Sequence, residues 1–157
     1  MTDVRLVEQI PWRGRVRVIA RRRDGREEIE EISNLITDAA VNAVRDALMG
    51  VTADLEIRYV ALGSDATAPT PQDSQLGAEF FRKQVTKQKA GANAGEAVTT
   101  TYIAPYEANQ QIQEIGFFAG ASATSATNSG VLVARVLYSR LKTELESLQI
   151  VRTDDIG

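Results

Sequence analysis

The chain has 157 residues, of which 43% are hydrophobic and 25% are charged, and its formal net charge is −3. This length supports one domain with its own core, and the composition is that of a globular protein. Because the chain has no histidine and no cysteine, it has no disulfide, no Ser-His-Asp or Cys-His catalytic group and no zinc site built on those ligands. The slightly acidic balance gives no reason to expect nucleic acid as a partner.

The hydropathy pattern predicts no contact with a membrane. No apolar run reaches the roughly 20 residues that a membrane-spanning helix needs. The first residues, MTDVRLVEQIPWRGR, lack the apolar stretch of a secretory signal. We therefore expect a soluble protein that is made in the cytoplasm.

Residues 14–31, GRVRVIARRRDGREEIEE, predict a β-hairpin. Val16 and Val18 alternate with arginines, and Asp24-Gly25 is typical of a tight turn. The first arm carries arginines and the second carries glutamates, so attraction across the strands favours their pairing. We expect a solvated tip whose charges are neutralised, with a partner or phosphate contact as the alternative. The candidates for that contact are Arg21, Arg22 and Arg23.

The next segment, NLITDAAVNAVRDALMG, changes to the period of a helix at about residues 37–49. Thr37 or Asp38 is a suitable N-cap, and Gly50 stands where the helix should end. Apolar residues recur at steps of three and four, and this narrow, alanine-rich stripe predicts a helix that lies close against a sheet. The stripe consists of Ala40, Val41, Val44, Ala47 and Leu48.

Further segments of alternating or apolar residues predict strands, separated by loops rich in Gly, Ser, Thr, Asn and Pro. The fold class that follows is mainly β, an antiparallel β-sandwich with one packed α-helix and an N-terminal β-hairpin arm. We divide the chain into an arm with its hairpin at 1–33 and a sandwich domain at 34–157. Two low-complexity segments, 90–97 and 120–130, are expected to be flexible hairpin tips. The predicted strands are 55–62, 80–87, 96–103, 112–118, 131–138 and 145–152.

The segment 59–83, YVALGSDATAPTPQDSQLGAEFFRK, contains a long polar loop. Its spacing fits neither a phosphate-binding loop nor an EF-hand, so we expect no cofactor and no metal. Gly63 permits a sharp exit from the strand, Pro69 and Pro71 keep the loop extended, and Asp73 caps a short turn. We interpret the segment as a corner that passes from one sheet to the next and offers a loop to a neighbouring subunit.

Charged residues in apolar surroundings predict structural ion pairs. Arg135 lies within the apolar strand VLVARVLY, and a buried charge needs a partner. We expect it to meet Glu79 or Glu114, and we expect Arg82 to pair with Glu79. Nothing in the sequence brings two of the carboxylates of Glu79, Glu107 and Glu114 together for acid-base chemistry, so no catalytic residue is predicted.

Two doubled phenylalanines predict aromatic rings on both faces of their strands, because neighbouring strand residues point in opposite directions. One ring of each pair should therefore leave the first core, toward the helix or another chain. The aromatic residues are not interleaved with basic ones, which argues against stacking on single-stranded nucleic acid. The aromatic candidates for a subunit interface are Trp12, Phe81 and Phe117.

Five motifs, taken in order, resemble small tail, baseplate and tail-collar-fibre proteins of tailed bacteriophages. They are N-L-I-T-D at 34–38, A-L-G at 61–63, L-G-A-E-F-F-R at 76–82, E-I-G-F-F at 114–118 and A-R at 134–135. The resemblance covers about residues 34–150. It implies a non-enzymatic structural protein of the virion that assembles symmetrically, as a trimer or hexamer, with other virion proteins as partners. The segment 1–31 lies outside the resemblance and is expected to dock on a neighbour.

The sequence leaves three functions open. The first is a structural subunit of a phage tail, baseplate or collar. The second is a capsid decoration protein that clamps the head lattice. The third is a carbohydrate-binding module or hydrolase acting on the host envelope. The position of Trp12 argues against this function, because the single tryptophan lies in the N-terminal arm rather than in a stacking platform.

Overall fold

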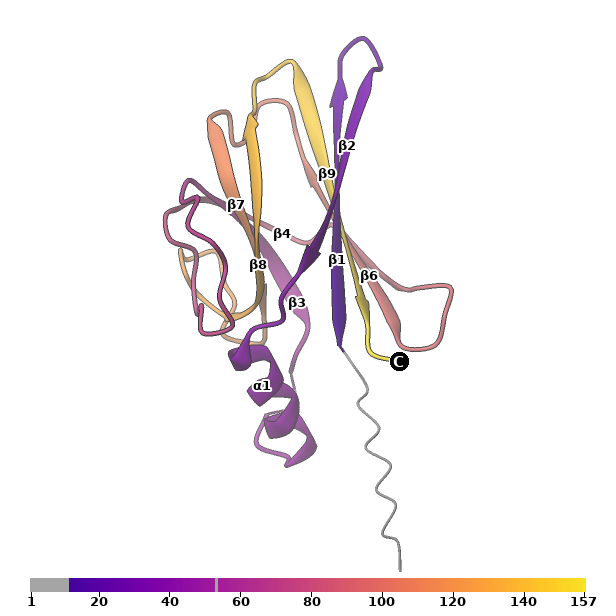
Figure 1. Ribbon diagram of the computed structural model, residues 1–157, viewed down its shortest axis with the longest axis vertical. Helices are drawn as coiled ribbons and strands as arrows, with labels where there is room; N and C mark the ends of the chain where they lie inside the picture. Colours follow the sequence, from indigo (N-terminus) through magenta and orange to yellow (C-terminus); the bar gives the residue numbers. More distant parts are fainter. Residues whose placement is uncertain (1–11, 53) are drawn as a thin grey trace, which may run out of the picture.

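The computed structural model describes residues 12–52 and 54–157. In that part of the chain, nine strands form two antiparallel sheets that pack face to face, with one helix at one end (Figure 1). One sheet has the order β2-β1-β9-β6-β5 and the other β4-β3-β7-β8, which confirms the expected sandwich. The strands are β1 Arg13–Arg22, β2 Glu27–Asn34, β3 Ile57–Gly63, β4 Glu79–Gln84, β5 Lys87–Ala90, β6 Glu96–Ile103, β7 Gln111–Ala119, β8 Val131–Leu141 and β9 Glu146–Asp155, and the helix is α1 Asp38–Leu48.

The core lies between the two sheets and is built from alternate residues of their strands. Val16 and Val18 of β1 and Ile150 of β9 face inward from the five-stranded sheet. Ile115 and Phe117 of β7 meet them from the four-stranded sheet. All five are at most 1% exposed. The two-residue period of the sequence is thus the pattern that forms this core.

The N-terminal hairpin is part of the sandwich rather than an arm beside it. β1 pairs with β9 along its whole length, from Arg13↔Asp155 to Arg22↔Glu146, and with β2 on its other edge. A boundary at residue 33 therefore does not separate the hairpin from the sandwich. The preceding part of the expected docking arm, residues 1–11, lies outside the described residues.

The chain crosses between the sheets at a different place from the expected corner. β3 and β4 are neighbours in one sheet, so the long loop between them joins adjacent strands and the expected passage to the other sheet is wrong. The next crossing after this loop occurs at Val85 and Thr86, where the predicted strand 80–87 divides into β4 and β5. The amide of Val85 donates to Arg58 of the four-stranded sheet (2.8 Å), and the next amide donates to Thr100 of the five-stranded sheet (2.9 Å). Consecutive backbone donors are satisfied by opposite sheets.

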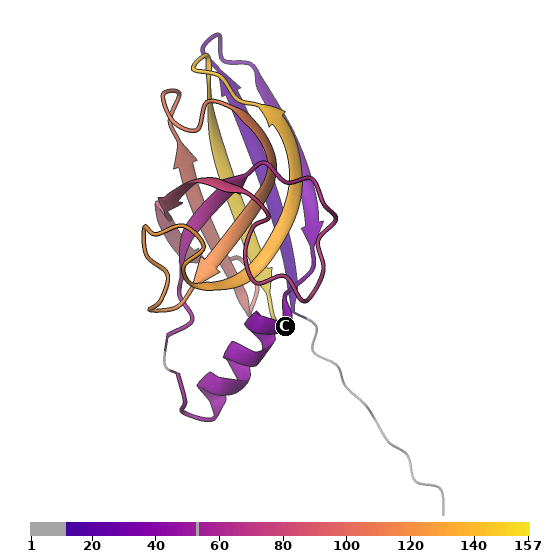
Figure 2. The same ribbon diagram turned by 90° about the vertical axis from the view of Figure 1, so that its left-hand side faces the viewer.

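Helix α1 begins where the sequence predicts, at a Thr37 N-cap. The Thr37 hydroxyl accepts a hydrogen bond from the amide of Ala40 and donates to the carbonyl of Leu132 in β8. The Thr37 amide donates to Val133 (3.0 Å). The helix is thereby fixed to one strand of the four-stranded sheet and extends beyond the end of the sandwich (Figure 2). Among the described residues, no helix has the length and the apolar character needed to cross a membrane.

The apolar stripe of α1 is oriented differently from the expectation. Only Ala40 and Ala43 of the helix are buried. Val41 and Leu48, expected to face the sheet, are 53% and 85% exposed. The helix approaches the sandwich through its alanines, while Val41 and Leu48 remain on the surface.

Replacing Val18 by Ala tests whether the hairpin shares the global core. Val18 is fully buried, so loss of its methyl groups should lower the free energy of unfolding by roughly 2 kcal/mol. Ile29→Ala on β2, where the side chain is 54% exposed, should change it by less than about 0.5 kcal/mol. Urea denaturation measures both variants. Equal effects would contradict the placement of β1 in the core.

Candidate functional site

A buried ion pair connects β7 and β8 on the outer face of the four-stranded sheet. Arg135 Nε lies 2.5 Å from Glu114 Oε2. The Glu114 side chain is fully buried, and that of Arg135 is 4% exposed. Gly63 stands opposite Glu114 in the neighbouring strand, where a Cβ atom would lie only 2.2 Å from the carboxylate. The structure thus brings Arg135 to Glu114, one of the two partners expected from the sequence.

The carboxylate of Glu114 holds both ends of the loop at 64–78. It accepts hydrogen bonds from the backbone amides of Asp65 (3.3 Å), Gly77 (3.1 Å) and Ala78 (2.8 Å). A carboxylate that accepts several amide hydrogen bonds no longer needs water as a partner. The loop therefore begins and ends at one buried charge.

Arg135 fixes the middle of the same loop. Its guanidinium donates to the carbonyls of Asp65 (3.0 Å) and Thr67 (2.7 Å), and it lies 3.6 Å from the carboxylate of Asp73. The hydroxyl and amide of Thr67 donate to the Asp65 carboxylate, which lowers the pKa of that group. The loop is folded onto its own sheet and is organised by the ion pair.

The pair Glu79 and Arg82 forms a second anchor of this kind. Two nitrogens of Arg82 donate to the Glu79 carboxylate at 2.9 and 2.8 Å, and both side chains are almost fully buried. The third nitrogen donates to Ser129 in the loop 120–130, and the guanidinium lies 4.4 Å from the ring centre of Phe118. The expected flexible tip is instead attached to the sheet by Arg82.

The doubled phenylalanine of β7 does point to both faces, but neither ring is available to another chain. Phe117 is in the main core, beneath the guanidinium of Arg152 at 4.8 Å. Phe118 is on the outer face, where it packs with Leu76 of the long loop. Both phenylalanines are fully buried, so the expectation that Phe117 lies at an interface is wrong. Phe81 is partly buried against the main core.

The arginines at the hairpin tip are exposed and lie beside glutamates. Arg21 pairs with Glu27 at 2.6 Å, and Arg22 approaches Glu28 at 3.5 Å. The amide of Arg23 donates to Leu145, which connects the tip to the turn before β9. The cross-strand neutralisation expected from the two charged arms is therefore present at Arg21 and Arg22.

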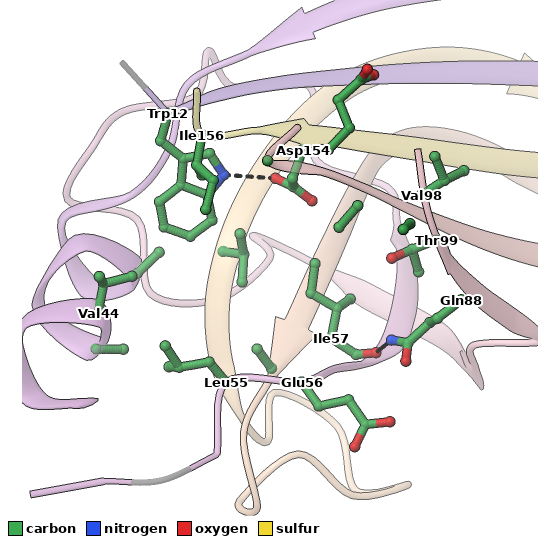
Figure 3. Close-up of a pocket in the computed structure, with 18 of the residues that line it drawn as sticks. Trp12, Val44, Leu55, Glu56, Ile57, Gln88, Val98, Thr99, Asp154 and Ile156 are labelled. Carbon is green, nitrogen blue, oxygen red and sulfur yellow. Dashed lines mark hydrogen bonds between the residues drawn. The ribbon is translucent and has the colours of Figure 1, made fainter. Parts of the chain in front are cut away.

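An apolar groove of about 760 Å³ opens between the two sheets at the end that carries α1 (Figure 3). Its walls come from α1, from the segment before β3 and the first residue of β3, from β5, β6 and β8, and from the C-terminal ends of β7 and β9. Most of its lining side chains are apolar, and the charged ones are Glu56, Lys89, Glu96 and Asp154. The apolar lining consists of Trp12, Ala40, Ala43, Val44, Leu55, Ile57, Ala90, Ala97, Val98, Ala119, Val131, Val133 and Ile156.

Trp12 is held at the groove by a buried charged pair. Its indole Nε1 donates to Asp154 Oδ1 at 2.9 Å (Figure 3). The same carboxylate accepts two hydrogen bonds from Arg152, at 2.8 and 2.6 Å. Arg152 also donates to Asn34 at 3.3 Å. The charge of Asp154 is thus taken up by its neighbours, and the carboxylate is a positioning group for Trp12.

The role of Arg152 and Asp154 was missed because the strand was expected to end at residue 152. The signal was in the sequence, since Leu148, Ile150, Arg152 and Asp154 occupy alternate positions of one strand. They share the inward face of β9, where all four are at most 6% exposed. Two charged residues that continue an apolar alternation indicate an internal pair.

The remaining carboxylate candidate, Glu107, is also held in an ion pair, with Lys83. Within residues 12–52 and 54–157, no three acidic side chains gather in a way that could hold a metal ion. Burial raises the pKa of Glu107, but Lys83 at 2.7 Å and the amide of Ala104 outweigh this effect and hold the pKa below its usual value. Comparisons of the chain with protein-family models, with curated proteins and with solved structures give no match.

Glu114→Gln and Arg135→Met test the ion pair beneath the long loop. Each single change leaves one buried charge without its partner and should lower the free energy of unfolding by about 3–5 kcal/mol. The double variant should lose less than the sum of the two. Hydrogen exchange at the amides of Gly77 and Ala78 should become faster, because their acceptor is changed or displaced.

The surface pair of Arg21 and Glu27 provides the matched control. Arg21→Met and Glu27→Gln should each cost no more than about 1 kcal/mol. Additive effects of the Glu114 and Arg135 variants, with unchanged exchange in the loop, would contradict the organising role of the pair.

Proposed function

We propose that the protein is a non-enzymatic structural subunit of a tailed-phage particle, in its tail, baseplate or collar. It acts through symmetric contacts between copies and with other virion proteins. The order of the motifs along residues 34–150 supports this assignment by resemblance. The observation that carries it is the apolar surface at the end of the sandwich.

That surface consists of exposed aliphatic side chains on α1 and the turn after it. Leu48, Met49 and Val51 are 85%, 66% and 69% exposed. Val41 lies seven positions before Leu48, on the same side of the helix, and is 53% exposed. Single exposed apolar residues are ordinary, but a cluster on one short element, beside an apolar groove, is typical of a protein contact.

The edge strand β2 disfavours contacts along its side of the five-stranded sheet. β2 is an edge strand, and it carries exposed glutamates at positions 27, 28, 30 and 31. Charges of one sign on an edge strand discourage pairing with the same strand of another copy. Subunit contacts through the apolar end therefore agree with the distribution of charge.

Two alternatives remain under this proposal. A capsid decoration protein would use the same apolar end to bind the head lattice. A carbohydrate-binding module is less well supported, because Trp12 is the single aromatic residue among the groove-lining residues that the structure describes, and its indole is bound to Asp154. Sugar-binding sites built on stacking need an accessible aromatic face.

Electron microscopy with gold-labelled antibodies distinguishes these functions. We expect antibodies against the purified protein to label the tail, baseplate or collar of particles released by the bacterium that carries the gene. Label on the head would favour decoration. Unlabelled particles, together with binding of the protein to a glycan array, would contradict a structural role.

A further inference from the structure

The groove has the size and lining of a binding site. Its volume of about 760 Å³ lies within the range of roughly 300–1,000 Å³ that is usual for clefts that bind ligands. Protein interiors are close-packed and contain few voids larger than a water molecule. Figure 3 shows Val44 on one side and Val98 on the other, with Leu55 and Ile57 along the lower edge. Such a space suits several aliphatic side chains in a row.

One wall of the groove is the edge of a sheet. β5 (Lys87–Ala90) is the last strand of the five-stranded sheet, and β6 is its one strand neighbour in the part of the chain that the structure describes. Gln88, Lys89 and Ala90 of this strand line the groove. An edge of this kind is a template to which an extended segment can add through backbone hydrogen bonds, while its side chains enter the adjoining pocket.

The sequence that precedes Trp12 is suited to such an edge. Trp12 is itself part of the groove lining, and residues 1–11 precede it in the sequence. In MTDVRLVEQIP, Val4, Leu6 and Ile10 occupy even positions and Asp3, Arg5 and Gln9 occupy odd ones, a partial alternation of the kind that a strand with one buried face shows. Eleven extended residues reach at most about 40 Å, which is far enough to enter a neighbouring molecule.

We propose that residues 1–11 of one copy add to the edge of β5 in a second copy and place Val4, Leu6 and Ile10 in its groove. This inference rests on the proposed function, because it names the contact through which the subunits assemble. In a closed ring, each subunit would give its segment to the next one; in a dimer, the two copies would exchange their segments. In both arrangements every subunit is joined to another.

The position of Trp12 favours a second copy over the chain's own groove. Arg13 is already in β1, and Trp12 is held by Asp154. A turn back into the same groove would have to be made at Pro11, immediately before these fixed residues. Proline fixes φ, and the residue before it prefers an extended conformation. The sequence around Pro11 therefore predicts an extended continuation of the chain, which favours a neighbouring copy as the acceptor.

Introduced cysteines test this contact directly, because the chain has no cysteine of its own. Chains carrying Leu6→Cys are mixed with chains carrying Lys89→Cys and oxidised gently. We expect a covalent dimer on a non-reducing gel that disappears on reduction. Chains with Arg23→Cys, at the exposed hairpin tip away from the groove, are the matched control and should cross-link at least tenfold less.

Two results of this experiment would overturn the proposal. Equal cross-linking at Lys89→Cys and Arg23→Cys would show random collision. In a chain that carries both Leu6→Cys and Lys89→Cys, a closed monomer that resists dilution would show that the segment occupies its own groove.

Light scattering on the full chain gives an independent test. Leu6→Asp with Ile10→Asp should weaken self-association at least tenfold, whereas Gln9→Asp, on the opposite face of the predicted strand, should leave it unchanged. Trp12 is the single tryptophan, so its fluorescence should change with association in the unaltered protein and not in the Leu6/Ile10 variant.

The outcomes separate this inference from the proposed function. A stable oligomer that Leu6→Asp with Ile10→Asp leaves intact would overturn the exchange, while a role in the particle would stand on another surface, such as that of α1. A monomer at every concentration would also overturn the exchange. Cross-linking as expected, with no antibody label on particles, would support the exchange and remove the phage assignment.

Discussion

The buried pair of Glu114 and Arg135 is the constraint on which much of the outer sheet depends. Removing two charges from water costs several kcal/mol for each ion, so both must find their remaining hydrogen bonds inside the protein. Here the backbone of the 64–78 loop supplies them. The loop must therefore fold over the sheet, and in doing so it brings Leu76 onto Phe118 and covers a second apolar layer. An electrostatic requirement thus determines where a hydrophobic contact forms.

The same arrangement recurs at other long connections of the sandwich. Arg82 binds the loop between β7 and β8. Lys142 is a buried residue, 1% exposed. Its ammonium donates to the carbonyl of Pro105 and to the side-chain oxygen of Asn109. Burial lowers the pKa of Lys142. In a protein without cysteine or histidine, long basic side chains take the place of disulfides and metals in fixing loops. The conformations of these three connections are thereby each tied to one cation.

Much of the fold could be predicted from local patterns. The alternation of Val16 and Val18, the N-cap at Thr37 and the isolated charge of Arg135 each carry their own physical signal. The groove could not be predicted, because its walls come from segments that are distant in the sequence. The division of 80–87 between two sheets was equally hidden, since an extended segment does not specify its partner strand. Phe117 was misassigned because nothing in its own strand shows that both of its faces are covered.

The pairing of β1 with β9 also has a mechanical consequence. Arg13 and Asp155 are partners at one end of this antiparallel ladder, and Arg22 and Glu146 are partners at the other. A pulling force applied between residues 13 and 155 acts across the strands, so it opens the hydrogen bonds one after another, beginning at the end nearest α1. The same ladder loaded along the strand axis, between Arg22 and Asp155, would resist with all its bonds at once. Tolerance of tension in this protein therefore depends on the direction in which its attachments pull.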